Sequence, residues 1–496
     1  MQLPSRSLGL LTLAFLAACA QGETGYADAR AGSPTLPMTT TSDVARTHFE
    51  QGQRAMDLAN GPVAHEHFLQ AVAADPDFAL AHLRAANTAP SLEGYTTHLA
   101  HAEALADSAS QSEQLLIKMD RAGFQNDWAT GLSYAKQLAE ISPGSPRALT
   151  NLAGWQASVK DYAGERASLE QALGVAPAFL PAVIDLSNSY LFNDPKDFAR
   201  GAEYARRAVE IEPDEPYAHD MLGDALRRQG DLAGARDAYT RAAALDPTNG
   251  NYLQQRGHVN SFLGDFDAAR ADYDAAIALG KRNQRAAFAQ WRAFVPLYAG
   301  NPDAAIAELR QLAAAIDTMG VEEPRGLKIG TEAQILWIAG HTGKWQVYDE
   351  SLARITALFN ARMEQVGTDD FRRQEQSNIA FWEGLRAAYH GDVQGAKASA
   401  DRIGELLAPM DNPRKMEGAH MLLGLAELEA GNHAEALTHL DQANPNFIYV
   451  TYLKARAHEG LGHAADAQAL YREVAEYNFN NAAAALTRNE ARSKLQ

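Results

Sequence analysis

The sequence predicts an all-α protein in which short helical hairpins stack into a solenoid. Residues 216–249 form two amphipathic helical segments that are joined by a glycine turn and closed by a proline. Approximate copies recur on both sides, and the best of them is offset by 34 residues. Each helix has only about 12 residues, which is marginal in water. The hairpins must therefore stack on their neighbours to bury their apolar faces.

Each part of this unit has a physical reason. Met221, Leu222 and Leu226 share one helical face in the first half of the unit. Gly230 can adopt the left-handed conformation that ends a helix, and Asp231 can accept hydrogen bonds from the free N–H groups of the next helix. The second half carries one stripe of mostly small and apolar residues: Ala235, Tyr239, Ala242 and Leu245.

This pattern resembles the tetratricopeptide repeat (TPR). The matching positions are Leu222, Gly223, Gly230, Ala235, Tyr239, Ala242 and Pro247. The following unit repeats five of them 34 residues later, at Gly257, Gly264, Ala269, Tyr273 and Ala276. The resemblance implies a right-handed α-solenoid of about twelve TPR-like hairpins with a C-terminal capping helix.

The regularity of the pattern suggests how the chain is divided. We expect a TPR solenoid over 44–312, an irregular break at 313–328, TPR-like repeats over 329–481 and the capping helix over 482–496. The break includes the segment DTMGVEEPRGLK, residues 317–328, which is marked by Gly and Pro. One long helix is expected from about Lys344 to Gln365.

The N-terminus resembles a bacterial lipoprotein signal peptide over residues 1–19. Arg6 provides a positive segment, residues 8–16 form an apolar core too short to span a bilayer, and Cys19 ends the sequence LAAC. Cys19 is the only cysteine in the chain. The alternative is an ordinary cleaved signal with a chance cysteine. Residues 20–43 are rich in Gly, Ala, Ser, Thr and Pro, which indicates a flexible tether.

The lipoprotein resemblance implies lipidation of Cys19 and an anchor in the membrane. Ala20 stands where many inner-membrane lipoproteins have Asp, so the resemblance favours the bacterial outer membrane, with the chain facing the periplasm. The formal net charge is −18, from 44 basic and 62 acidic residues, and no basic cluster is present. We therefore expect no nucleic-acid partner.

The chain contains no motif of a nucleotide-binding loop, a nucleophile elbow or a zinc protease. We therefore expect no enzymatic activity and no cofactor. The leading hypothesis is a scaffold that binds protein or peptide partners in a concave groove. The alternative is a small-ligand-binding or enzymatic accessory protein with its site in the irregular region 313–376.

Histidine is the one unevenly distributed residue type. Six of the 15 histidines lie between His48 and His101. His98 and His101 share a helical face, whereas His65 and His67 point apart. Tight metal sites need three or four convergent ligands, so no metal site is predicted.

The expected groove is lined by the first helices of the hairpins. Tyr, Met and Arg are enriched at binding surfaces. The candidate groove residues are Tyr217, Asp220, Met221, Asp224, Arg227 and Arg228 in the central unit, and Asn251, Gln254, His258 and Ser261 in the next.

Overall fold

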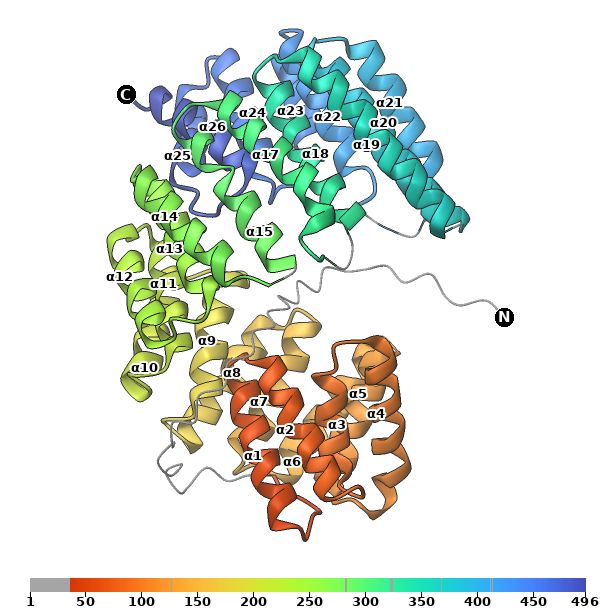
Figure 1. Cartoon of the computed structure of the whole chain (residues 1–496), viewed down its shortest axis with the longest axis vertical. Coiled ribbons are helices and arrows are strands. Elements are labelled where there is room, and N and C mark those ends of the chain that lie inside the picture. Colours follow the sequence, from red (N-terminus) through yellow and green to blue (C-terminus); the bar gives the residue numbers. More distant parts are fainter. Residues whose placement is uncertain are drawn as a thin grey trace. The chain divides into compact units, whose positions relative to one another are not determined.

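The computed structural model describes residues 36–125, 127–281, 283–321, 324–366, 368–410, 412 and 414–496. These residues form 26 α-helices, most of them paired as antiparallel hairpins (Figure 1). Helices α1 to α25 make twelve hairpins, because α15 and α16 together form one arm, and α26 follows as a single helix. The predicted all-α solenoid of about twelve hairpins with a C-terminal helix is confirmed. The signal peptide, including Cys19, lies outside the described residues.

The contacts divide the chain into two compact units, with the boundary between Thr248 and Asn249. The N-terminal unit contains α1 (Asp43–Asp57), α2 (Gly61–Ala74), α3 (Ala79–Asn87), α4 (Leu92–Leu105), α5 (Gln111–Phe124), α6 (Trp128–Ile141), α7 (Pro146–Ser158), α8 (Tyr162–Val175), α9 (Leu180–Phe192), α10 (Phe198–Ile211), α11 (Pro216–Gln229) and α12 (Leu232–Leu245), with a 3-10 turn at Ala106–Ser108.

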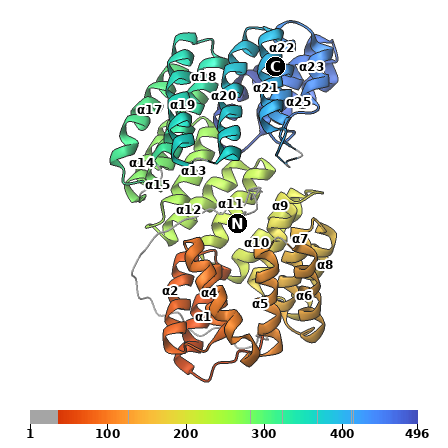
Figure 2. The ribbon, with the colours of Figure 1, turned by 90° about the vertical axis from the view of Figure 1, so that its right-hand side faces the viewer.

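The C-terminal unit contains α13 (Gly250–Leu263), α14 (Phe266–Leu279), α15 (Asn283–Arg292), α16 (Val295–Tyr298), α17 (Pro302–Ala315), α18 (Pro324–His341), α19 (Trp345–Val366), α20 (Asp369–Tyr389), α21 (Val393–Leu407), α22 (Glu417–Glu429), α23 (His433–Leu440), α24 (Ile448–Gly460), α25 (Ala464–Glu476) and α26 (Ala482–Lys494), with a 3-10 turn at Ile316–Thr318. Figure 2 shows α17 to α20 side by side, and α19 spans the long helix predicted near 344–365. The expected domain break at 313–328 covers the end of α17 and the start of α18, and it stays a prediction.

The turns of the hairpins follow the local chemistry of the sequence. Gly230 ends α11 in the left-handed conformation (φ 85°), as Gly264 does for α13 (φ 84°). The Asp231 side chain then accepts a hydrogen bond from the N–H of Gly234 at 2.9 Å. This bond satisfies one of the free donors at the start of α12.

Small residues let the two helices of a hairpin pack closely. A Cβ atom placed on Gly223 would lie 2.5 Å from the Tyr239 ring, so only glycine fits between α11 and α12 here. Tyr239 is fully buried, and its hydroxyl donates to Asp224 Oδ1 at 2.5 Å. The matching residues of the next hairpin, Gly257 and Tyr273, are also in close contact.

Residues 36–42 lie on the N-terminal unit rather than extending away from it. Leu36 is buried in the core that α1 to α7 share. The Thr39 N–H donates to Glu113 Oε1 at 3.0 Å, and the Thr40 hydroxyl donates to Asp75 Oδ2 at 2.5 Å. Of the tether expected over 20–43, residues 20–35 lie outside the described part of the chain.

Helix α26 turns back onto earlier hairpins of its own unit. It packs on α25, as a terminal helix should, and it also contacts α16, α18 and α24 (Figure 1). Asn489 donates to the Tyr298 carbonyl at 2.9 Å, and His341 Nε2 lies 3.0 Å from Glu490 Oε1. The C-terminal helix therefore covers the first helices of several hairpins as well as the last one.

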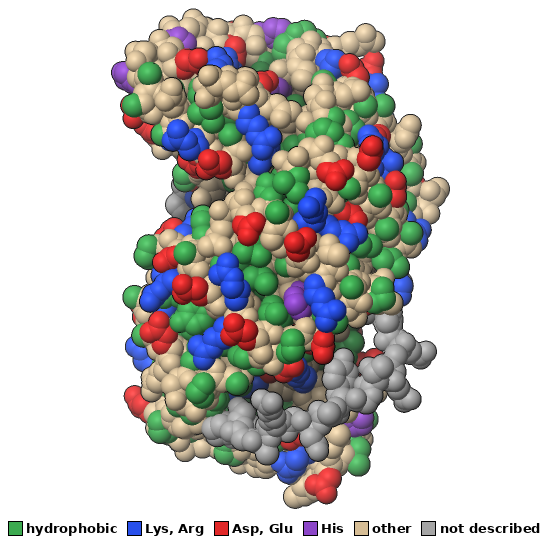
Figure 3. All heavy atoms as spheres, turned by 90° about the vertical axis from the view of Figure 1, so that its left-hand side faces the viewer, with side chains coloured by type: hydrophobic (Ala, Val, Ile, Leu, Met, Phe, Trp, Pro, Cys, Tyr) green, Lys and Arg blue, Asp and Glu red, His purple; other side chains and the backbone are tan. Residues whose placement is uncertain are grey.

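The surface carries charge of both signs. On the face shown in Figure 3, basic and acidic side chains are interspersed over the described part of the molecule. Among the described residues, no helix combines the length and the apolarity that crossing a bilayer requires.

Candidate binding pocket in the N-terminal unit

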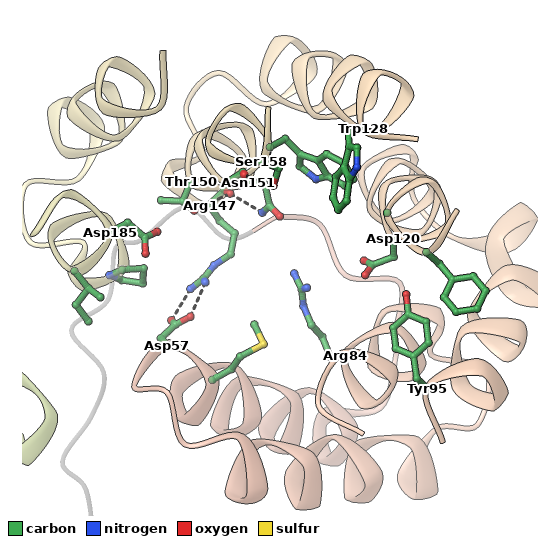
Figure 4. Close-up of a pocket in the computed structure, with 17 residues that line it drawn as sticks. Asp57, Arg84, Tyr95, Asp120, Trp128, Arg147, Thr150, Asn151, Ser158 and Asp185 are labelled. Carbon is green, nitrogen blue, oxygen red and sulfur yellow. Dashed lines mark hydrogen bonds and ion pairs between the residues drawn. The ribbon is translucent and has the colours of Figure 1, made fainter. Parts of the chain in front are cut away.

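The first helices of the N-terminal hairpins surround a pocket of about 460 Å³ (Figure 4). Helices α1, α3, α5, α7 and α9 provide its charged side chains, and α6 adds Trp128. The charged lining residues are Asp57, Arg84, Asp120, Arg147 and Asp185. A smaller pocket of about 220 Å³ adjoins it and shares Asp185. The candidate site therefore lies on the surface where the groove was expected, but closer to the N-terminus.

Arg84 is a buried cation that faces this pocket. Every residue from Ala79 to Ala86 on α3 is buried, and Arg84 itself is only 7% exposed. Figure 4 shows its guanidinium reaching into the space between Asp57 and Asp120. Its Nε–H finds no acceptor among the described residues. A guanidinium has five N–H donors, so Arg84 keeps hydrogen-bonding capacity for a ligand.

Asn87 links Arg84 to Asp120. With its amide oriented so that both ends are satisfied, Asn87 donates to Asp120 Oδ1 at 2.8 Å and accepts from Arg84 Nη1 at 3.2 Å. Burial raises the pKa of Asp120 to about 6, although the charge of Arg84 and the Asn87 hydrogen bond act in the opposite direction. Burial also raises the pKa of the neighbouring Tyr95 to about 12, with Asp120 adding to the effect.

An ion pair joins the two sides of the pocket. Arg147 on α7 donates two parallel hydrogen bonds of 2.7 Å to Asp57 on α1, across 90 residues of sequence. Both side chains are mostly buried, so this bidentate pair is weakly screened by solvent. The charge of Arg147 is thereby neutralised by Asp57. Among the described residues, Arg84 is linked to a carboxylate only through Asn87.

Asp185 gives the pocket a group that titrates near neutral pH. Burial raises its pKa to about 7, and the charges of Glu165 and Asp57 push it in the same direction, while Arg147 opposes them. Asp185 lines both pockets, so its charge affects both.

Aromatic side chains form the apolar wall of the pocket. The rings of Trp128 and Trp155 lie 5.9 Å apart, and those of Tyr95 and Phe124 are stacked at 5.5 Å. Gly131 makes room for Trp155, because a Cβ there would approach the indole to 2.1 Å. Aromatic rings with convergent polar groups are typical of binding pockets.

The six candidate groove residues of α11 have different environments. The Asp224 carboxylate accepts from Arg227 at 2.7 Å. Burial, followed by the charge of Asp224, raises the pKa of Asp220 well above its ordinary value, while Arg227 opposes the rise. Burial is also the main cause of the raised pKa of Tyr217, to which Asp220 and Asp224 contribute. The structure thus brings Tyr217, Asp220, Asp224 and Arg227 together.

The other two residues of that set lie apart from this cluster. Met221 is 5% exposed and belongs to the hydrophobic core. Arg228 stacks on the Phe192 ring, with its guanidinium carbon 3.9 Å from the ring centroid. Met221 is therefore a packing residue rather than a groove contact.

The candidate residues of α13 belong to the C-terminal unit, and two of them are buried. Ser261 donates to the Gly257 carbonyl at 2.8 Å within its own helix. His258 Nδ1 lies 2.6 Å from the Tyr273 hydroxyl and 2.9 Å from Asn480 Nδ2, on the segment that leads into α26. This corrects the expectation for His258 and Ser261, because the side chains are enclosed by the protein and do not face a groove.

Asn251 and Gln254 are partly buried and make local contacts. The Asn251 amide donates to Asn249 Oδ1 at 2.8 Å, and Gln254 Nε2 lies 3.0 Å from His258 Nε2. Their role as groove residues stays a prediction.

The N-terminal histidines are partly brought together. His82 Nδ1 and His98 Nδ1 lie 3.3 Å apart, and the His101 ring stacks on that of His82 at 5.1 Å. His65 and His67 do point apart: His65 contacts Thr88, whereas His67 stacks on His48.

The sequence contains one signal for the pocket. Arg84 and Asp185 each stand among mainly apolar neighbours, in HLRAA and VIDLS. A charge on the buried side of an apolar helix must find a partner or face a cavity. Because α1 and α7 are far apart in sequence, no spacing rule would have paired Asp57 with Arg147.

The fold and this pocket define an α-helical repeat protein whose hairpins present an inner surface lined by their first helices. Two family models described as tetratricopeptide repeat match residues 216–249 and 250–279. A TPR repeat-containing protein of Pseudomonas aeruginosa is 38% identical over 85 residues, which cover 17% of this chain and 78% of that protein. The chain belongs to the tetratricopeptide repeat family.

Other similarities are more partial. Tetratricopeptide repeat protein 36 of Bos taurus is 34% identical over 88 residues, 17% of this chain and 47% of that protein. Among solved structures, PilW, a type IV pilus biogenesis factor, is 17% identical with a TM-score of 0.35 over 42% of this chain and 94% of that one. MamA from Desulfovibrio magneticus is 20% identical with a TM-score of 0.31 over 34% and 94%.

Proposed function

We propose that this chain is a non-enzymatic scaffold that binds a protein or peptide partner in the pocket of its N-terminal unit. TPR proteins generally act as protein-interaction scaffolds, so the family supports binding as the activity. The observation that carries the proposal is Arg84, a buried cation that faces a pocket of about 460 Å³ and retains an unfilled donor. The overall acidity of the chain makes nucleic acid an unfavourable partner.

The chemistry of the lining indicates what enters the pocket. Arg84 offers N–H donors, so the partner contributes an acceptor oxygen, either a backbone carbonyl or a carboxylate. Trp128 and Trp155 offer an apolar surface for a side chain next to that oxygen. An extended peptide provides both features at neighbouring positions.

Site-specific crosslinking tests the proposal. A photoreactive residue at Ser158, which is exposed and lines the pocket, should crosslink a partner in cells. The matched control has the photoreactive residue at position 137, because Gln137 is exposed on α6, the second helix of its hairpin. Arg84→Met should reduce the Ser158 crosslink at least tenfold, because it removes the donors while keeping an unbranched side chain. Equal crosslinking from both positions, or no effect of Arg84→Met, would contradict a pocket-borne function.

We further propose that Cys19 is lipidated and anchors the scaffold in the outer membrane, facing the periplasm. The support is the LAAC sequence, the position of the sole cysteine and Ala20 after it. Cys19→Ser should move the protein from the membrane fraction to the soluble fraction. Retention of the variant in the membrane fraction would refute the anchor, while an ordinary cleaved signal predicts soluble protein for the wild type as well.

A further inference from the structure

Three potential metal ligands converge at the turn between α24 and α25. His458 lies near the end of α24, His463 is the N-cap of α25, and Asp466 lies in the first turn of that helix. One donor atom from each residue lies within 4.8 Å of the other two. His458 Nδ1 is 3.3 Å from His463 Nδ1 and 3.9 Å from Asp466 Oδ2.

The backbone of the turn produces this convergence. Gly462 adopts a positive φ of 77°, and the His463 N–H donates to the His458 carbonyl at 2.9 Å. The chain therefore reverses direction within five residues and places both imidazoles on the same side. Asp466, three residues into α25, returns to that side.

His463 departs from the residue type that other hairpins use at this position. In six other hairpins the N-cap side chain of the second helix is an aspartate that accepts a hydrogen bond from the first turn: Asp127, Asp161, Asp197, Asp231, Asp265 and Asp392. His463 makes no such bond. The start of α25 therefore lacks a stabilising side-chain cap. In its place, His463 puts an imidazole nitrogen beside His458 and Asp466.

The geometry suits a borderline-soft cation. Two imidazole nitrogens at about 2.0–2.1 Å from a tetrahedral Zn²⁺ are separated by about 3.3–3.4 Å, which matches the 3.3 Å between His458 and His463. The His458 side chain is 24% exposed and that of Asp466 is 67% exposed, so an ion and its water ligands can reach the site. Imidazole donors favour Zn²⁺, Cu²⁺ and Ni²⁺ over Mg²⁺ and Ca²⁺.

We propose that His458, His463 and Asp466 bind one divalent transition-metal ion, with water completing its coordination. Bound metal joins the end of α24 to the start of α25. The proposal is independent of partner binding in the N-terminal unit, because all three ligands lie in the C-terminal unit.

Two other histidine pairs have similar spacing but lack a third ligand. His420 Nδ1 and His439 Nδ1 are 3.4 Å apart, and His82 Nδ1 and His98 Nδ1 are 3.3 Å apart. Among the described residues, no further His, Cys, Asp or Glu completes either pair. The pair of His420 and His439 therefore provides a matched control.

The test is isothermal titration of the chelator-treated full chain with Zn²⁺. We expect one site per chain in the wild type, unaffected by excess Mg²⁺. His463→Asn should weaken binding at least tenfold while restoring a good N-cap, so loss of binding would not reflect misfolding. His439→Ala should retain full binding.

Thermal unfolding with and without Zn²⁺ gives a second readout. Zn²⁺ should raise the Tm of the wild type and of His439→Ala but not that of His463→Asn. Unchanged Zn²⁺ affinity in His463→Asn, or binding that is lost only in His439→Ala, would overturn the assignment. Absence of Zn²⁺ binding in the wild type would also overturn it.

Discussion

Replacing Gly223 by alanine tests the close packing on which each hairpin depends. The new Cβ would lie 2.5 Å from Tyr239 Cε1 and 2.7 Å from two further ring atoms. Because carbon atoms pack at about 3.5–4.0 Å, the ring or the helix must move by about 1 Å. Such overpacking costs about 1–3 kcal/mol. The better helix propensity of alanine offsets about 0.5–1 kcal/mol of this cost.

The movement also disturbs a buried hydrogen bond. The Tyr239 hydroxyl donates to Asp224 at 2.5 Å, and Tyr239 is fully buried. We therefore expect Gly223→Ala to lower the free energy of unfolding by about 1–2 kcal/mol. Gly154→Ala is the matched control, since Gly154 is also helical and, among the described residues, no atom outside its own stretch of helix lies within 4 Å of its Cβ position. This control should be stabilised by about 0.5–1 kcal/mol.

Urea unfolding followed by circular dichroism measures the difference between the two variants. Repeat arrays can lose cooperativity, so amide hydrogen exchange of α11 and α12 should accompany it. Faster exchange confined to these two helices in Gly223→Ala would support the packing. A Gly223→Ala protein as stable as Gly154→Ala would show that α11 and α12 do not approach as described.

Three further predictions concern the Asp57–Arg147 ion pair, the buried carboxyl of Asp185 and the contact of Asn480 with His258. Asp57→Asn should destabilise the N-terminal unit by about 1–3 kcal/mol, since it leaves Arg147 without its bidentate partner; an unchanged urea midpoint would refute the pair. Asp185 has a pKa raised from 3.8 in the unfolded chain to about 7 in the folded protein. Its contribution to the free energy of unfolding is therefore complete below about pH 4 and is lost as the pH rises through about 7. Asp185→Asn should therefore gain stability relative to the wild type over this pH range, and parallel stability curves would contradict the shift. Asn480→Ala should cost about 1–3 kcal/mol and speed hydrogen exchange in α26, because it removes the donor to His258; unaltered exchange would mean that α26 is held in other ways.

The hairpins were predictable because their determinants are local. Gly230 and Asp231 act within one turn of chain, and Gly223 meets Tyr239 across a single hairpin. Each copy of the pattern has the same local determinants, so the number of hairpins and the terminal helix could be predicted from the repeats.

The pocket, and the inner surface near His258 that the C-terminal segment covers, depend on contacts between residues far apart in sequence, which the repeat pattern does not predict. Asp57 meets Arg147 across 90 residues, and Asn480 meets His258 across 222. For this reason the groove prediction failed at His258, where the protein's own C-terminal segment occupies the surface. The proposed metal ligands could not be predicted for a different reason: the local density of histidines does not mark a site, because coordination depends on the convergence of side chains at one turn.

The return of α26 has a consequence for the order of folding during synthesis. A hairpin array can form progressively as it leaves the ribosome, since each unit needs only its neighbour. The inner surface near His258 and Tyr298 is different, because its partners Asn480 and Asn489 are translated almost 200 residues or more later. That surface stays open to chaperones, or to the wrong hairpins, until the last helix has been made.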